Sequence, residues 1–269
     1  MNPIEVSVMI ACYNDGQYLG QALDSVQAQT FKSWEIIVVD DGSDNTTIAQ
    51  LKKRESQINR MLFLEHGGVS NARNKALQEA KGTYILVLDA DDYLEPDAME
   101  KALKVLQDEN VTIASYQAYR FWKNKVFNVY KPKGGTLKDF LFNNEALGTS
   151  MYRREDLLAI GGYDESMQLG FEDWELHLRL LQKGGEAVVL EEPLYHYRKK
   201  PNSRNVDAVS NKYRILEYMV QKHPGIYGEK EVVDYLFKKL QQHQANTKAG
   251  NTNFEKKVIR LLRSLRGAK

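Results

Sequence analysis

One segment constrains the fold of this chain more than any other: an apolar run over residues 84–88 leads directly into three carboxylates, Asp89, Asp91 and Asp92. A run this apolar is typical of a strand buried on both faces of a parallel sheet. Ligands bind at the carboxyl ends of such strands, so the acids lie where a site is expected. Three close anions repel one another, and Mg²⁺ or Mn²⁺ carrying a phosphate group would relieve that repulsion. The alternative is that Asp91 and Asp92 only cap a helix beginning near Pro96.

Short apolar runs alternate with amphipathic segments through the first hundred residues. The apolar runs cover residues 6–11, 35–39, 61–64 and 84–88, and a segment with helical periodicity follows each of them. This alternation is typical of βαβ units and predicts a parallel sheet covered by helices. Beyond residue 111 the segments become rich in Tyr and Phe and include a predicted hairpin. The expected fold class is therefore α/β, with a mixed, mainly parallel sheet flanked by helices.

The same patterns divide the chain into a main domain and an extension. Residues 1–205 contain all the predicted strands, with 1–108 forming one half of the domain and 109–205 the other. Residues 206–269 are predicted to be a helical C-terminal extension, whose last helix has an apolar stripe opposite a basic face. Residues 254–269 are expected to contact an anionic inner membrane peripherally, or to pack the stripe on the protein body or on an oligomer partner.

Composition limits the class of protein and its partners. The 269 residues are 42% hydrophobic, which is enough for a core, and 37 Lys and Arg against 36 Asp and Glu leave a net charge of +1. Without a basic field, nucleic acid is not an expected partner. The single cysteine, Cys12, favours a reducing compartment. A cytoplasmic protein is expected, because the sequence has neither a signal-peptide pattern nor an uncharged apolar run of about 18 residues.

Groups suited to a nucleobase and to a phosphate follow other predicted strands. Tyr13 follows the first apolar run, and Asp40 ends the second. An aromatic ring stacks on a base, and a carboxylate accepts a hydrogen bond from a ring NH such as N3 of uracil. Ordinary turn chemistry is the alternative for residues 40–44. Arg73 lies in the first turn of a predicted helix after two glycines, a place that favours an anion, although a surface arginine is equally compatible.

These motifs together closely resemble those of family 2 glycosyltransferases. The resemblance is carried, in order and spacing, by Tyr13-Asn14, Asp40-Asp41-Gly42-Ser43, Ala72-Arg73-Asn74 and Asp89-Ala90-Asp91-Asp92, and it covers residues 5–200. It implies a Rossmann-like GT-A fold, a nucleotide-sugar donor, a divalent metal and inversion at the anomeric carbon. Residues 1–108 would then be the nucleotide-binding half and residues 109–205 the acceptor half.

The resemblance assigns roles to residues at the nucleotide end of the site. Tyr13 and Asp40 would contact the base, and Arg73 the nucleotide or its diphosphate. Cys12 stands where relatives often have threonine, and a thiol is a weaker donor and acceptor. One hydrogen bond of Cys12 to the base would therefore be weakened or rearranged, although a UDP-linked donor remains the expectation.

A metal site is implied at the DXD element formed by Asp89 and Asp91. Asp91 is the leading ligand, and Asp89 would hold the ribose or a metal-bound water. His196, after a predicted strand, would complete the site, as a histidine near this position does in some GT-A enzymes; a structural histidine is the alternative. Arg198 and the lysines after it would clamp phosphate when the next segment closes, unless they form a solvated charge run.

The resemblance places catalysis in the second half, at Glu172 and Asp173. In an inverting transfer one carboxylate takes the proton of the acceptor hydroxyl, whose oxygen attacks from the face opposite the leaving diphosphate. Asp173 is the expected base, Glu172 would orient it or bind acceptor hydroxyls, and Trp174 would pack beside a sugar ring. The alternative is that both acids only complement the dipole of the helix they begin.

The predicted function is metal-dependent, inverting transfer of a sugar from a nucleotide-diphosphate donor to a hydroxyl of a glycan or lipid-linked saccharide. The expected donor is a UDP-sugar, and the expected metal is Mn²⁺ or Mg²⁺. A noncatalytic nucleotide-sugar or glycan binder on the same fold is the alternative. The joint presence of Asp89, Asp91 and Asp173 argues against it, because a binder needs no proton acceptor.

Overall fold

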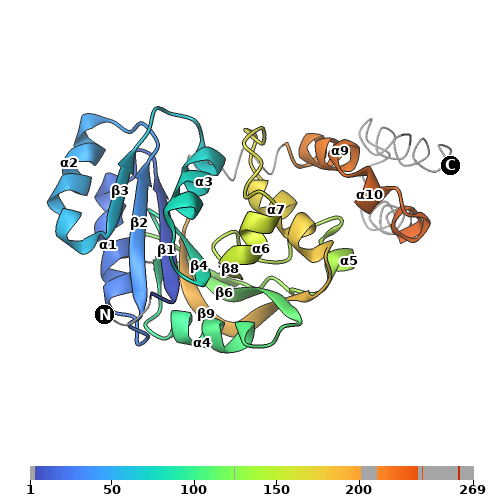
Figure 1. Ribbon diagram of the computed structural model, residues 1–269, viewed down its shortest axis with the longest axis horizontal. Helices are drawn as coiled ribbons and strands as arrows, with labels where there is room; N and C mark the ends of the chain where they lie inside the picture. Colours follow the sequence, from blue (N-terminus) through green and yellow to red (C-terminus); the bar gives the residue numbers. More distant parts are fainter. Residues whose placement is uncertain (1–3, 124, 201–210, 236–237, 239–259, 261–269) are drawn as a thin grey trace.

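One mixed sheet forms the centre of the molecule. The computed structural model describes residues 4–123, 125–200, 211–235, 238 and 260 of the chain. Within these residues nine strands follow the order β3-β2-β1-β4-β8-β6-β9-β5, with β7 paired to β6 (Figure 1). The strands are β1 (Val6–Cys12), β2 (Trp34–Asp40), β3 (Arg60–Phe63), β4 (Tyr84–Asp89), β5 (Tyr93–Leu94), β6 (Val111–Trp122), β7 (Lys125–Tyr130), β8 (Met151–Arg153) and β9 (Glu186–Arg198). The predicted α/β class with a mixed sheet is confirmed.

The first half of the sheet is parallel, and its strands end side by side. β1 pairs with β2 and β4, and β2 pairs with β3, all in parallel. The register places Cys12 opposite Asp40 and Ala11 opposite Asp89. The side chains that follow these three strands therefore share one edge of the sheet, as expected for a ligand site in an open α/β sheet.

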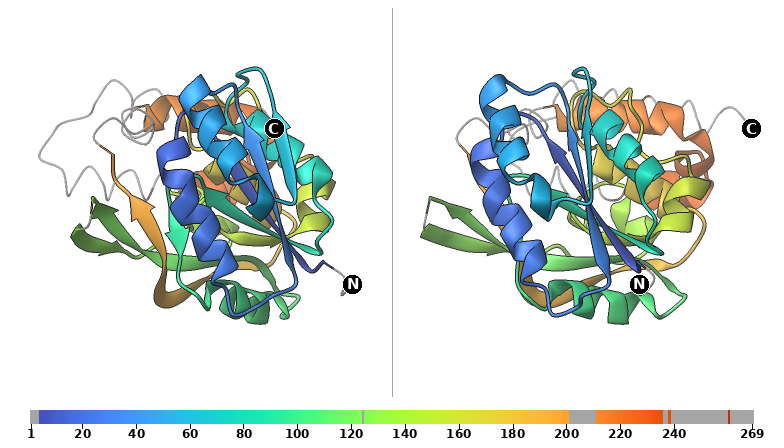
Figure 2. Two further views of the ribbon diagram at one scale, coloured as in Figure 1. Left: turned by 90° about the vertical axis from the view of Figure 1, so that its left-hand side faces the viewer. Right: turned by 60° about the vertical axis from the view of Figure 1, so that its left-hand side comes forward.

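The second half of the sheet combines parallel and antiparallel pairs. β8 lies antiparallel between β4 and β6, whereas β9 runs parallel to β6. The β6–β9 pairing shifts register on either side of Gln117, which lies opposite Pro193. The predicted hairpin is formed by β6 and β7 and projects from the body of the molecule (Figure 2). Each register shift changes which side chains of β9 face a given side of the sheet.

Helices cover both faces of the sheet. On one face Val8 of β1 packs in a buried cluster with α1 (Gly16–Gln27) and α4 (Ala98–Leu106). On the other face Met9 packs in a cluster with α3 (Val69–Glu79) and α7 (Glu172–Leu181). Because both faces are buried, the central strands β1, β2 and β4 are mainly apolar, and the buried polar pair within them, Ser7 and Glu35, shares a hydrogen bond of 2.6 Å. The remaining helices are α2 (Asn45–Lys53), η1 (Glu55–Gln57), α5 (Leu137–Phe140), α6 (Arg154–Ala159), α9 (Lys212–Lys222) and α10 (Pro224–Tyr227).

The described part of the C-terminal extension is helical, but it shares the core of the main domain. α9 and α10 contribute to the same buried cluster as α7 (Figure 1). Glu175 of α7 is fully buried and accepts hydrogen bonds from Lys222 at 3.0 Å and His223 at 2.8 Å. The predicted boundary at residue 205 therefore does not separate two cores. The predicted amphipathic segment 254–269 lies almost entirely outside the described residues, and no described helix is long and apolar enough to cross a membrane.

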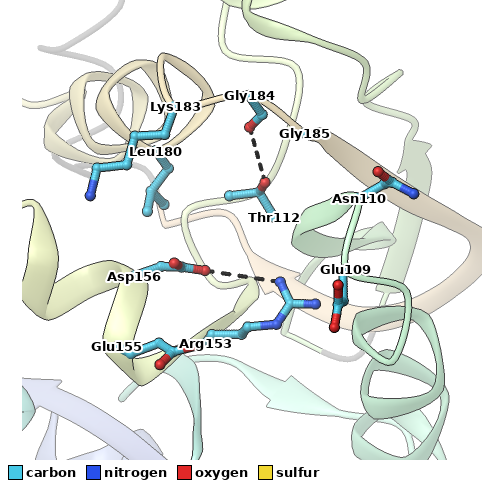
Figure 3. A pocket seen from close by; sticks show the side chains of 10 residues that line it. All are labelled: Glu109, Asn110, Thr112, Arg153, Glu155, Asp156, Leu180, Lys183, Gly184 and Gly185. Atoms are coloured by element: carbon cyan, nitrogen blue, oxygen red, sulfur yellow. Dashed lines mark hydrogen bonds and ion pairs between the residues drawn. The ribbon is translucent and has the colours of Figure 1, made fainter.

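A small hollow of about 410 Å³ lies between α6, α7 and the start of β6, where Arg153 faces Asp156 (Figure 3). Arg153 donates hydrogen bonds to the carbonyl oxygens of Val111 and Leu106, both at 2.6 Å. Leu106 is the last residue of α4, so the guanidinium satisfies a carbonyl left free at a helix C-terminus. We therefore assign a structural role to the polar groups of this hollow.

Candidate active site

A cleft of about 990 Å³ lies at the carboxyl ends of the parallel strands. Its wall combines residues from both predicted halves of the main domain. Side chains with polar groups on this wall include those of Tyr13, Asp15, Asp41, His66, Arg73, Asp89, Asp91, Asn144, Asp173 and Lys200. The predicted donor-binding residues Tyr13, Arg73, Asp89 and Asp91 therefore lie on the same cleft as the predicted base, Asp173.

The three carboxylates at the carboxyl end of β4 have different surroundings. All three reach the wall of the cleft. Asp92 is buried and accepts hydrogen bonds from the Tyr195 hydroxyl at 2.9 Å and from the backbone N–H of Arg198 at 2.7 Å. Asp92 thus fastens the loop after β4 to β9.

Lys200 supplies a positive charge to Asp91. Its ammonium lies 2.8 Å from Asp91 Oδ2 and 2.7 Å from Asp15 Oδ1. Burial and the nearby Asp89 raise the pKa of Asp91, and Lys200 opposes them. Burial lowers the pKa of Lys200, but the charges of Asp91 and Asp15 raise it above the ordinary range. The protein itself therefore places a cation on the predicted metal ligand.

Arg73 joins the acids of the two halves. Its Nη2 lies 2.8 Å from Asp89 Oδ1, and its Nη1 lies 2.9 Å from Glu172 Oε1. The guanidinium is buried, and it lies over the ring of Tyr163 at 5.3 Å. Its Nε is also buried and has no hydrogen-bond partner among the described residues. The nucleotide contact of Arg73 stays a prediction, and the structure adds its role as a bridge between two carboxylates.

Asp173 has the surroundings of a general base. Glu172 and Asp173 begin α7, immediately after Phe171, which has a left-handed backbone with φ 57°. Burial, with a further contribution from Glu172, raises the pKa of Asp173 to about 7, and Arg73 opposes this shift. A carboxylate whose pKa lies near neutrality is suited to accept a proton in a neutral solution.

Both oxygens of the Asp173 carboxylate are held by hydrogen bonds. Oδ1 accepts from the backbone N–H of Trp174 at 2.9 Å, and Oδ2 accepts from the Asn144 amide at 2.8 Å. Gly148 lies against the same carboxylate, because a Cβ added there would be 2.7 Å from Asp173 Oδ2. Sequence reasoning missed Asn144 and Gly148, since the loop that carries them has no recognisable motif.

An exposed aromatic pair stands at the end of the cleft where the base is predicted to bind. Tyr13 is 47% exposed and stacks on His66, with the ring centroids 4.2 Å apart. His66 Nδ1 lies 3.0 Å from the carbonyl oxygen of Asp41. The Asp41 carboxylate accepts hydrogen bonds from the backbone N–H groups of Gly67 and Gly68 at 2.8 and 3.0 Å. His66 was not predicted from the sequence as a site residue, although His66 directly precedes the glycine pair Gly67-Gly68.

Cys12 and Asp40 lie deeper than Tyr13. Cys12 reaches the cleft wall but is buried, and burial raises the pKa of its thiol to about 12. Asp40 is buried and is not part of the wall. Its Oδ2 accepts from the backbone N–H of Ser43 at 3.1 Å, and its Oδ1 has no hydrogen-bond partner among the described residues. A base contact from either residue stays a prediction.

The prediction that His196 is a metal ligand is wrong for this structure. The ring of His196 stacks on Tyr93 with centroids 4.0 Å apart, and its Nε2 lies 2.6 Å from Glu95 Oε1. Tyr195 and Tyr197 line the cleft, whereas His196 does not. Successive side chains of a strand point to opposite faces, so His196 points away from Asp89 and Asp91.

Burial bears on the predictions for Arg198 and Trp174. Arg198 donates from Nε to the carbonyl oxygen of Asp91 at 2.6 Å and lies over the Tyr18 ring at 4.3 Å. It therefore fastens the acidic loop, and because Arg198 also lines the cleft, its contact with phosphate stays a prediction. Trp174 has no exposed surface, and its Nε1 donates to the carbonyl oxygen of Phe140 at 2.5 Å. The Trp174 side chain therefore anchors the start of α7 to Phe140 of α5, and its ring has no exposed face on which a sugar could pack.

The donor groups fit a cation that arrives with phosphate. Among the described residues, no group of three His, Cys, Asp or Glu side chains could hold a metal ion. Asp89 and Asp91 are neighbours among the carboxylates that line the cleft. Mg²⁺ in nucleotide sites is usually held by one or two carboxylates together with substrate phosphates. The arrangement therefore fits a metal–diphosphate site and does not fit a metal centre made of protein ligands alone.

Solved structures identify the class of fold. TarS of S. aureus, in a fragment solved with UDP, superposes with a TM-score of 0.65 at 20% identity over 90% of this chain and 73% of that chain. The mannosyltransferase PcManGT from Pyrobaculum calidifontis, solved with GDP-Man and Mn²⁺, gives 0.59 at 17% identity over 98% of this chain and 85% of that chain. The fold is that of the GT-A glycosyltransferases, as the resemblance implied.

Sequence comparison then gives the family. The model of glycosyl transferase family 2 matches residues 7–174, so the chain belongs to this family of glycosyltransferases. The Bacillus subtilis relative TuaG is 31% identical over 218 residues, which are 78% of this chain and 83% of TuaG. The glycosyltransferase GlyA of Streptococcus pneumoniae is 27% identical over 254 residues, which are 83% of this chain but 36% of GlyA. A noncatalytic binder finds no support in these relatives.

Proposed function

We propose that this glycosyltransferase moves a sugar, with inversion, from a UDP-sugar to a hydroxyl group of a glycan or lipid-linked saccharide. The observation that carries the proposal is the position of Asp173, a carboxylate with a raised pKa on the same cleft as Asp89 and Asp91. Arg73 links the two groups of acids by ion pairs at 2.8 and 2.9 Å. The diphosphate end and the base thus belong to one site.

Proton transfer follows from this placement. The acceptor oxygen attacks the anomeric carbon from the face opposite the diphosphate, its proton moves to the Asp173 carboxylate, and the bond between the sugar and the diphosphate oxygen breaks. The nucleoside diphosphate leaves with the bonding electron pair. Inversion is the result of this single displacement, because the new bond forms on the face opposite the old one.

Other residues of the cleft bind the donor. The Tyr13–His66 pair offers an exposed aromatic face for a base, and the unpartnered Asp40 Oδ1 suits a ring NH if the donor reaches it. Asp91 and Asp89 would hold a divalent cation, which supplies positive charge to the departing diphosphate when bound. Relatives solved with nucleotide ligands support this assignment, since TarS binds UDP and UDP-GlcNAc, and PcManGT binds GDP-Man and Mn²⁺.

A thermal-shift panel of UDP- and GDP-sugars, with and without Mn²⁺, identifies the donor, because a ligand that binds only the folded state raises its melting temperature. UDP release from the selected donor then measures turnover, with water or an added saccharide as acceptor. Asp173→Asn should keep the thermal shift and lose about 10²- to 10⁴-fold in kcat. Glu109→Gln, which neutralises an exposed carboxylate away from the cleft, is the matched control. Normal turnover by Asp173→Asn would refute the assignment of the base.

A further inference from the structure

We propose that Asn144, His177 and Tyr152 are positioning residues, which hold the Asp173 carboxylate in one orientation through a chain of hydrogen bonds that runs from the cleft wall into the core. Asn144 Nδ2 lies 2.8 Å from Asp173 Oδ2, and Asn144 Oδ1 lies 2.9 Å from His177 Nδ1. His177 Nε2 lies 2.8 Å from the Tyr152 hydroxyl. This inference deepens the proposed function and rests on the role of Asp173 as the base.

The direction of every hydrogen bond in the chain follows from Asp173. An ionised carboxylate only accepts, so the Asn144 amide must donate with Nδ2 and accept with Oδ1. The acceptor Oδ1 requires a proton on His177 Nδ1, which leaves a lone pair on Nε2. The Tyr152 hydroxyl then donates to Nε2 at 2.8 Å, a closer contact than the 3.4 Å that separates it from the carbonyl oxygen of Gly148. One tautomer of His177 satisfies the whole chain.

Burial keeps the chain in this state. His177 and Tyr152 are both fully buried, and the ring of Phe140 meets His177 edge-on with centroids 5.7 Å apart. Burial, with a contribution from Arg73, lowers the pKa of His177 to about 3. The imidazole is therefore neutral at working pH, and its Nε2 stays an acceptor. A protonated ring would donate from both nitrogens and break the contact with the Tyr152 proton.

The far end of the chain is fixed to the centre of the sheet. Tyr152 belongs to β8 and pairs with Ile85 of β4 and Ile113 of β6. Catalytic groups placed by rigid elements are held more accurately than groups placed by loops. Asn144 lies on a loop, and the chain through His177 gives this loop residue a connection to both α7 and β8. The carboxylate consequently has a defined orientation before an acceptor binds.

The chain also tunes the base. A hydrogen bond donated to the ionised form of a carboxylate lowers its pKa. The chain thus opposes the effect of burial and keeps Asp173 able to lose its proton near neutral pH. The other titratable groups that act on or near Asp173 are Glu172 on α7, Arg73 on α3, Asp89 on β4, Tyr130 on β7, Tyr152 on β8 and Tyr163. Substitutions of Asn144, His177 or Tyr152 leave the charges of Glu172, Arg73 and Asp89 unchanged.

The test compares His177→Leu with His177→Asn, two side chains of similar size. Asparagine keeps an N–H donor near the position of Nδ1, and leucine does not. His177→Leu should lower kcat on the order of 10²-fold, because the carboxylate loses its orientation. The acidic limb of the kcat–pH profile should move to higher pH, while the donor-induced thermal shift stays unchanged. His177→Asn should restore most of kcat and the position of the limb.

Tyr152→Phe and Tyr227→Phe form a second matched pair that serves if His177→Leu does not fold. Tyr227 is also fully buried, but its hydroxyl donates to the carbonyl oxygen of Leu141 at 3.2 Å, outside the chain. Tyr152→Phe should lower kcat and raise the acidic limb, and Tyr227→Phe should do neither. Equal kcat and equal pH profiles within both pairs would overturn the positioning role. If Asp173→Asn is inactive while these variants are normal, only the positioning role fails; if Asp173→Asn is fully active, the proposed base and its positioning both fail.

Discussion

Replacement of Asp173 by asparagine should stabilise the fold while it stops transfer. The pKa of Asp173 is about 7 in the folded protein, against about 3.9 in an unfolded chain. Folding therefore disfavours the ionised form. The ionised Asp173 therefore lowers the free energy of unfolding of the wild-type protein. This loss is absent below about pH 4, where Asp173 is protonated in both the folded and the unfolded state. It grows between about pH 4 and pH 7 and is complete above about pH 7.

The size of the effect follows from the same surroundings. A difference of three pKa units corresponds to about 4 kcal/mol at most, and local relaxation around a half-buried group reduces it. Asparagine has one oxygen, so it also loses one of the two hydrogen bonds that Asp173 accepts, from Trp174 and Asn144, at about 1 kcal/mol. We expect a net gain of about 2 kcal/mol at pH 8, which raises Tm by about 5 °C.

Thermal unfolding of the two proteins between about pH 4 and about pH 8 tests this reasoning. The Tm difference should be slightly negative at the acidic end, where only the lost hydrogen bond counts, and should grow in favour of Asp173→Asn as the pH rises. Glu109→Gln controls for the loss of one negative charge and should show no such growth. If Asp173→Asn melts at or below the wild-type temperature at the alkaline end, or if the difference does not depend on pH, the raised pKa of Asp173 is refuted.

Three further predictions concern the same cleft. Lys200→Met removes the ammonium that lies 2.8 Å from Asp91, so Mn²⁺ should bind the nucleotide-free protein up to about tenfold more tightly; an unchanged electron paramagnetic resonance titration of free Mn²⁺ would contradict this. Gly148→Ala places a methyl group 2.7 Å from Asp173 Oδ2, so kcat should fall at least about tenfold with the donor thermal shift kept. Gly225→Ala, where a Cβ meets only an ordinary contact at 3.7 Å, is the control, and equal kcat for the two variants would argue against the close approach. The Cys12 thiol, whose pKa burial raises to about 12, should resist iodoacetamide at pH 8 until the protein is denatured; rapid labelling of the folded protein would contradict its burial.

The nucleotide half of the site is predictable because its motifs follow directly from strand burial. A strand covered on both faces is mainly apolar, so the cluster of polar residues that ends the apolar run marks its carboxyl end. The registers of Cys12 with Asp40 and of Ala11 with Asp89 then bring the ends of three strands together. No long-range information beyond parallel pairing is required to place Tyr13 near Asp89.

The second half is less predictable because the geometry of β9 includes irregularities. A strand pattern predicts which residues share a face only while the register is regular, and the pairing of β9 shifts twice around Pro193. His196 therefore carries no sequence signal for the face on which it lies. Asn144 is hidden for a different reason: its importance comes from hydrogen bonds to Asp173 and His177, which are distant in sequence.

Arg73 explains how acids that are far apart in the sequence come together in one site. It also explains why these acids differ in the ease with which they take up a proton. The planar guanidinium has separate N–H groups, one of which binds Asp89 and another Glu172. A buried charge without a partner is costly, so these two ion pairs also fix the acceptor half relative to the nucleotide half. Asp173 is the neighbour of Glu172 but makes no ion pair with Arg73 among the contacts of the described residues. Because the cation is shared between the other two acids, its opposing effect on Asp173 is smaller than the effect of burial, and the pKa of Asp173 stays raised to about 7. The same bridge that holds the two halves together thus leaves one carboxylate able to exchange a proton.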